Sequence, residues 1–111
     1  MAVIDFTQKE KIAVADVLLQ MICADGEIDE GEKQYMYQLQ GALEITNADI
    51  EKAINEDTLS SLMVIRDMEK TKKEAVTIMM HEMMCADGEI DEGEVHLILW
   101  VARLCGLPLP Q

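Results

Sequence analysis

A block of ten residues occurs twice in this 111-residue chain and limits its possible folds more than any other feature. The sequence CADGEIDEGE fills residues 23–32 and again residues 85–94, an offset of 62 without a single difference. The twelve residues before the two copies agree at four positions, and the twelve after them agree at none. A duplication alone would spread its similarity over the flanks, so a local role of the block explains its identity better. The chain is therefore expected to contain two equivalent units that turn at the same acidic segment.

Apolar residues recur at helical spacing before each block, and no strand pattern appears. Val14, Leu18 and Met21 follow the i, i+4, i+7 pattern of an amphipathic helix. The pairs Thr7–Glu10 and Thr71–Glu74 match capping boxes that would open the two helices, and a glycine in each block would end them. After the first block, one helical face is expected to carry Tyr35, Met36, Leu39, Ala42 and Leu43.

The remaining helices are shorter or more apolar. Thr46 or Asn47 can open a short helix that carries Ile50 and Ile54, and Asp57 or Thr58 can open another that carries Leu59, Leu62, Met63 and Met68. The last helix, 95–105, is apolar on nearly every side, which is typical of a centrally buried helix.

We therefore predict an all-α, compact single domain over 1–111 with about six helices. Units at about 7–43 and 71–106 are linked by short helices within 47–68, and a pseudo-twofold relates the two acidic loops.

The charge balance excludes several classes of partner. The chain has 22 acidic and 9 basic residues, a formal net charge of -13. Binding to nucleic acid depends on Lys and Arg at phosphates, and anionic lipid is disfavoured for the same reason. No uncharged apolar stretch approaches the roughly 18 residues of a membrane span, and no signal peptide is recognised. Three cysteines fit reduced thiols, so a cytoplasmic location is expected. Cations or basic proteins are the expected partners.

Each block places five carboxylates within eight residues, where like charges repel one another. The spacing matches the second half of an EF-hand loop, but Met21 and Cys23 stand where its first oxygen ligands would be. Two half-sets that face one another could complete an oxygen-rich site for Ca²⁺, Mg²⁺ or Mn²⁺. The candidate metal ligands are Asp25, Glu27, Asp29, Glu32, Asp87, Glu89, Asp91 and Glu94.

Two other interpretations of the acidic residues remain open. Asp29 and Asp91 can be helix N-caps with Glu32 and Glu94 as their capping-box partners, which requires no ligand. This capping interpretation leaves Asp25, Glu27, Asp87 and Glu89 unexplained. Alternatively, the acidic loops can dock a basic protein without metal.

The paired A-D-G-x-I-x-x-x-E segments that follow amphipathic helices resemble the TerB family, the tellurite-resistance-associated domain. The resemblance spans nearly the whole chain and implies a cytoplasmic, non-catalytic helical module linked to tellurite or metal stress. It also implies that Asp25, Glu32, Asp87 and Glu94 are metal ligands or part of a contact surface.

Other possible sites are weaker. His81, Glu82 and Cys85 follow a zincin-like spacing without a third ligand, and no nucleophile, phosphate loop or Cys–His pair has a credible spacing. The chain is therefore expected not to be an enzyme. Cys23 and Cys85 are expected to be small buried apolar residues, and His81 and His96 to lie at or near the surface. The nine methionines are expected to fill the core, or alternatively to line an adaptable groove.

Overall fold

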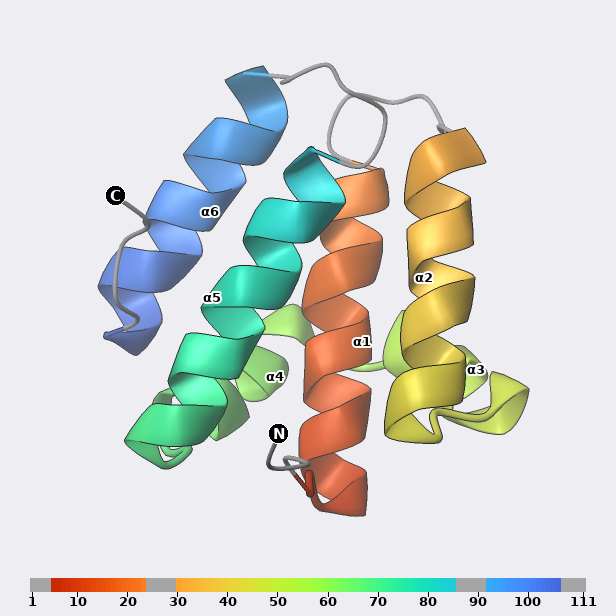
Figure 1. Ribbon diagram of the computed structural model, residues 1–111. Coiled ribbons are helices and arrows are strands. Elements are labelled where there is room, and N and C mark those ends of the chain that lie inside the picture. The colour runs from red at the N-terminus through yellow and green to blue at the C-terminus, as the bar shows by residue number, and fades with distance from the viewer. Residues whose placement is uncertain (1–4, 24–29, 86–91, 107–111) are drawn as a thin grey trace.

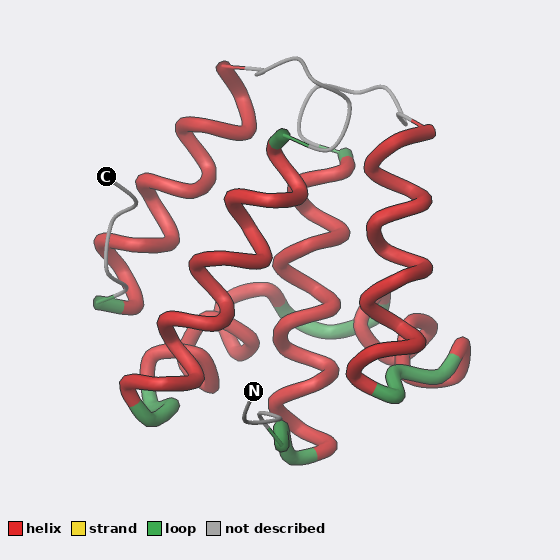
Figure 2. Tube along the Cα trace, viewed as in Figure 1, coloured by secondary structure: helices red, strands yellow, loops and turns green. Residues whose placement is uncertain are grey.

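The computed structural model describes residues 5–23, 30–85 and 92–106. Throughout these ranges the regular elements are helices, with no strand (Figure 2). The helices are α1 (Gln8–Ile22), α2 (Glu30–Leu43), α3 (Asn47–Ile54), α4 (Thr58–Arg66), α5 (Lys70–Met84) and α6 (Glu92–Cys105). The prediction of an all-α fold with six helices is therefore confirmed. None of the described helices is long and apolar enough to cross a membrane.

Short polar residues begin several helices, as their sequence patterns predicted. Thr7 accepts a hydrogen bond from the Glu10 backbone, while the Glu10 carboxylate accepts one from the Thr7 backbone, so the predicted capping box is present. Thr46 and Asp49 form the same arrangement at α3, and the Asp57 carboxylate caps α4. Each arrangement satisfies backbone N–H groups that the first turn of a helix leaves without partners.

The expected start of α5 at Thr71 is wrong. Glu69 is the N-cap residue and makes no side-chain capping bond, so Thr71 already lies in the first turn. Its hydroxyl is therefore past the position from which it could cap the helix.

Helix α1 is the central helix of the fold. The long helices α6, α5, α1 and α2 lie beside one another in that order, and α3 and α4 pack against α1 from behind (Figure 1). Eight of the 15 residues of α1 are buried. The expectation of a centrally buried α6 is wrong, because α6 lies at one side of the bundle and Leu99 is 42% exposed.

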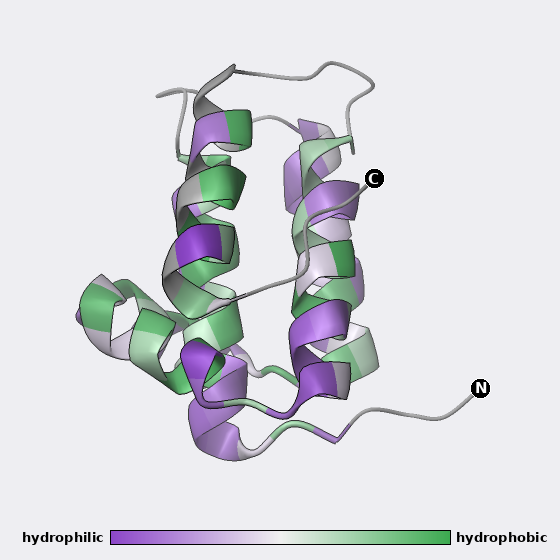
Figure 3. Ribbon diagram, turned by 90° about the vertical axis from the view of Figure 1, so that its left-hand side faces the viewer, coloured by the Kyte–Doolittle hydropathy of each residue, from purple (hydrophilic) through white to green (hydrophobic). Residues whose placement is uncertain are grey.

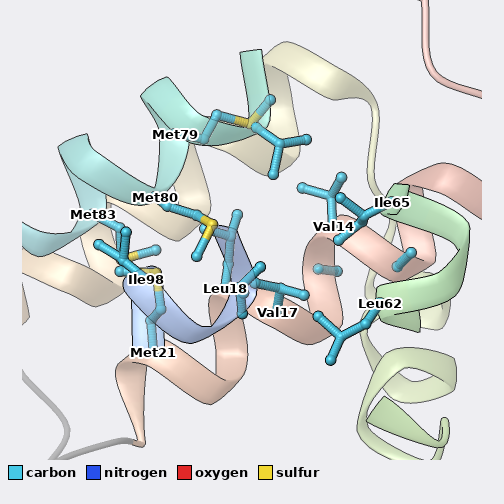
Figure 4. Packing of buried hydrophobic residues seen from close by; sticks show 14 of the residues in the cluster. Val14, Val17, Leu18, Met21, Leu62, Ile65, Met79, Met80, Met83 and Ile98 are labelled. Carbon is cyan, nitrogen blue, oxygen red and sulfur yellow. The ribbon is translucent and has the colours of Figure 1, made fainter. Parts of the chain in front are cut away.

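The core is formed mainly by aliphatic and methionine side chains. Val14, Val17 and Leu18 of α1 meet Leu62 and Ile65 of α4, with Met79, Met80 and Ile98 nearby (Figure 4). Burial of such side chains contributes about 1.5–3 kcal/mol each before the entropy cost of folding. Seven of the nine methionines lie in this core, which agrees with their expected role as core filler: Met21, Met36, Met68, Met79, Met80, Met83 and Met84.

The short helices bury only some of the apolar residues in their sequences, among them Leu62 of α4 at 2% exposed. Ile54, Leu59 and Met63 are 66%, 57% and 48% exposed, and Ala42 of α2 is also exposed. Helix α3 packs against α1, and α4 packs against α1 and α6; none of the described elements covers these remaining apolar residues. The N-terminal ends of α1 and α5, in the lower part of Figure 3, are mainly hydrophilic.

Candidate cation-binding end of the bundle

Most of the predicted metal ligands lie outside the described residues. Asp25, Glu27, Asp29, Asp87, Glu89 and Asp91 fall in 24–29 and 86–91, and the side chain of Glu94 is not described. Glu32 is the described member of the set. The described residues that bear on the predicted metal site are therefore Glu32 and the helix ends to which both segments are joined.

The helices on either side of the segments repeat at the offset of the blocks. Helices α1 and α5 begin and end at positions exactly 62 residues apart in number, and so do α2 and α6. The cap residues follow the same rule, since Cys23 donates its backbone N–H to Leu19 and Cys85 donates to His81, both at 3.1 Å. Each acidic segment therefore joins the end of one helix to the start of the next, and these helix ends are at equivalent positions in the two units.

Equivalent residues of the two units meet across the contact between α1 and α5. The Lys72 Nζ lies 2.7 Å from the Glu10 Oε1, and these residues are 62 positions apart. Met21 and Met83, another pair at this offset, are fully buried and point into the same part of the core (Figure 4). The Glu10–Lys72 ion pair near one end and the shared location of Met21 and Met83 near the other indicate that α1 and α5 run parallel and in register about a local twofold.

This packing places the described anchors of both segments together. Helices α1 and α5 end, and helices α2 and α6 begin, at the same end of the bundle (Figure 1). Helix α2 also contacts α5, because the Tyr35 hydroxyl donates a 2.7 Å hydrogen bond to the Glu82 carboxylate. The first unit therefore touches the second directly beneath the anchors.

A small polar pocket lies between α2 and α5. It has a volume of about 420 Å³ and is lined by Gly31, Gln34, Tyr35, Gln38, Glu82 and Cys85. Burial raises the pKa of the Tyr35 phenol, and the hydrogen bond to Glu82 and its negative charge raise it further. The phenol therefore stays protonated and keeps α2 joined to α5 at neutral pH.

Glu32 and Glu30 differ sharply in exposure although both lie in the first turn of α2. Glu32 is only 2% exposed, whereas the Glu30 side chain is 81% exposed and lies 3.4 Å from Lys33. A carboxylate in the first turn is favoured by the helix dipole in either position. Glu32 is thus held within the bundle at the end where the acidic segments attach, while Glu30 faces solvent.

The cysteines do not follow their expected burial. Cys23 and Cys85 are exposed because they occupy the C-cap positions of α1 and α5, where the chain leaves the core. Both are free thiols, as is the buried Cys105. His81 and His96 are exposed, as expected. Within 5–23, 30–85 and 92–106, the structure shows no group of three His, Cys, Asp or Glu residues that could hold a metal ion.

The contacts that join the two units were not predicted from the sequence. Tyr35 and Glu82 are 47 residues apart, and no sequence pattern pairs them. Glu10 and Lys72 could have been paired only through their shared offset of 62 and opposite charges. The repeat was therefore the one sequence signal for this interface.

These features define an all-α module of six helices with an internal twofold repeat and acidic segments anchored at one end. The family model described as tellurite resistance protein TerB matches residues 2–55, which span the first unit and α3. The chain therefore contains a TerB-like domain, and the resemblance to the TerB family is confirmed.

A solved structure extends the likeness in fold over the whole chain. The crystal structure of a protein of unknown function from Porphyromonas gingivalis W83 matches with a TM-score of 0.85 and 23% sequence identity. The match covers 100% of this chain and 87% of that one. No curated protein matches the chain. At this identity the likeness establishes the fold alone.

Proposed function

We propose that this TerB-like module is a non-catalytic, divalent-cation-binding protein of the cytoplasm, with a role in tellurite or metal stress. The cation is Ca²⁺, Mg²⁺ or Mn²⁺, bound at the end of the bundle where both acidic segments are anchored. The proposed ligands are Asp25, Glu27, Asp29, Glu32, Asp87, Glu89, Asp91 and Glu94.

The observation that carries this proposal is the parallel, in-register packing of α1 and α5. Because Glu10 meets its equivalent residue Lys72, the ends of the two helices lie at the same level of the bundle. The helix ends that carry the two identical acidic segments therefore lie beside one another, and the sequence of each segment holds half of an oxygen ligand set. Hard divalent cations prefer such carboxylate oxygens.

The clustered charges also give cation binding a thermodynamic role. Within the second block no lysine or arginine is present, and in the first unit Lys33 lies beside Glu30. A cation that binds only the folded chain stabilises it by about 2.7 kcal/mol at a hundred times Kd. For a domain of this size the melting temperature should rise by roughly 10 °C.

The test compares thermal unfolding and calorimetric titration with each of the three cations. We expect heat of binding and a raised melting temperature for the wild-type chain. Asp25→Asn with Asp87→Asn should abolish the rise and should also increase the melting temperature without metal, because it relieves repulsion. Glu30→Gln with Glu92→Gln is the matched control, since it removes two charges from the same blocks outside the ligand set.

Two outcomes would contradict cation binding. If millimolar cations produce neither heat nor stabilisation, the acidic residues act as helix caps and solvated surface. If Glu30→Lys with Glu92→Lys instead weakens capture of a basic protein without changing the melting temperature, the segments form a docking surface.

A further inference from the structure

A groove between α1 and α4 lies away from the acidic segments. It has a volume of about 530 Å³, and its apolar lining comes from Ile12 and Ala13 of α1 and from Met63 and Val64 of α4. Ala13 is 2% exposed and forms part of the floor, whereas Met63 is 48% exposed on the outer side. The groove is therefore an apolar surface that the chain itself leaves partly uncovered.

Further apolar surface adjoins this groove along α4. Leu59, one helical turn before Met63, is 57% exposed. The interior of the molecule does not require either side chain, because Leu62 and Ile65 supply the buried face of α4. Exposed apolar residues that line a groove, unlike scattered ones, are typical of an interaction surface.

Carboxylates lie beyond both ends of α4 at the edge of the groove. Glu56 precedes the helix and Asp67 follows it, and both line the groove and are exposed. Asp67 lies 3.5 Å from Arg66 on the surface, a contact that contributes little in solvent. Glu10, also at the groove, is held by Lys72, and Lys9 is the lysine on the α1 side. The α4 edge therefore favours positive charge at two separated points, and the net charge of -13 strengthens that preference.

We propose that this groove binds an amphipathic helix of another protein, with an apolar stripe flanked by two basic residues. The apolar stripe would cover Met63 and Val64, while the basic residues would meet Glu56 and Asp67. A helix running alongside α4 needs these basic residues roughly eleven positions apart, because both helices rise about 1.5 Å per residue. A spacing of eleven also keeps them on one helical face, since it is close to three turns.

The experiment titrates the full chain with a fluorescent helical peptide that carries a leucine stripe between two lysines eleven residues apart. We expect saturable binding that weakens with salt. Met63→Ser should weaken it at least tenfold, and Glu56→Gln with Asp67→Asn should weaken it and reduce its salt dependence. Ile78→Ser is the matched control, because Ile78 is as exposed as Leu59 but lies on α5. It should leave binding unchanged.

The same experiment can overturn the proposal in three ways. Absence of binding, or equal loss with Ile78→Ser, would show that the groove is not the docking site. If a peptide with glutamates in place of the two lysines binds equally well, the partner does not require basic residues, and this part of the proposal is wrong. Concentration-dependent dimerisation that Met63→Ser abolishes in sedimentation would identify a second copy of the chain as the occupant instead.

Discussion

Helices α1 and α5 hold equivalent places in the two repeats, but only α1 is enclosed by the rest of the fold. Their bounds differ by 62 at both ends, and six of their buried positions coincide at this offset. The difference lies on one face: Asp16 of α1 is 2% exposed, whereas its equivalent Ile78 on α5 is 57% exposed. Helices α3 and α4 cover this face of α1 and not that of α5.

The two repeats keep some features in common and differ in others. The shared buried positions join the two units, while the face covered by α3 and α4 has diverged between them. The Asp16 carboxylate accepts a 2.7 Å hydrogen bond from Ser61 of α4, a contact that the second unit lacks at Ile78 among the described residues. The acidic blocks remained identical although the helical faces around them changed. A role of the blocks separate from core packing explains this pattern best.

The largest expected effect tests the shared core. Met21→Ala and Met83→Ala should each lower the free energy of unfolding by about 2–5 kcal/mol, because both side chains are fully buried. Denaturant titration should give similar losses for the two variants. The double variant should lose less than the sum if the side chains share one part of the core. Strongly unequal losses would show that the core is not symmetric at this level.

The next largest change in unfolding free energy is expected on the helical face that differs between α1 and α5. Asp16→Ala leaves the buried Ser61 hydroxyl without its acceptor and should cost about 1–3 kcal/mol in unfolding free energy. Ile78→Ala at the equivalent position should change stability by less than about 0.5 kcal/mol, because the side chain is largely in solvent. The same denaturant titration measures both. A larger loss for Ile78→Ala would mean that α5 is covered on this face in solution.

Asp16 and Ile78 also show how far the sequence could predict the structure. Helix positions, most caps and the residues shared by both cores follow from local spacing and hydrogen-bonding chemistry. Burial of an aspartate and exposure of an isoleucine at equivalent positions oppose hydropathy, and they depend on which unit α3 and α4 cover. The acidic residues proposed as ligands are visible in the sequence for the same reason as the caps, since their pattern is local. The contacts that bring the two units together, Tyr35–Glu82 and Glu10–Lys72, arise only after packing.

A smaller change in the free energy of unfolding, of opposite sign in the two units, is expected for substitutions where α2 and α6 end. Glu44 and Gly106, again 62 apart, both adopt positive φ, at 56° and 68°. A side chain in this region costs about 1 kcal/mol, and glycine avoids the cost. Glu44→Gly should therefore raise the unfolding free energy by up to about 1 kcal/mol, and Gly106→Ala should lower it by a similar amount. Among the described residues a Cβ at Gly106 would meet only the Lys73 Nζ at 3.8 Å, so a loss there reports backbone strain.

Thermal unfolding of both variants measures this effect. If both substitutions change the melting temperature in the same direction, the two units do not share the same left-handed helix cap.

The smallest effect concerns pH and the contact between equivalent residues. Burial alone would raise the pKa of Glu10, but the hydrogen bond and positive charge of Lys72, with the Thr7 bonds, hold it below its usual value. The hydrogen bond to Glu10 in turn raises the pKa of Lys72. A lowered carboxyl pKa stabilises the fold above the usual pKa of glutamate, and this stabilisation is lost as the pH falls through the lowered value. Lys72→Met should therefore flatten the acid side of the stability curve, whereas Lys70→Met, on the same turn, should not. Urea unfolding from neutral pH to about pH 3 measures the slopes, and identical slopes for the wild type and Lys72→Met would show that this pair does not couple the two units in solution.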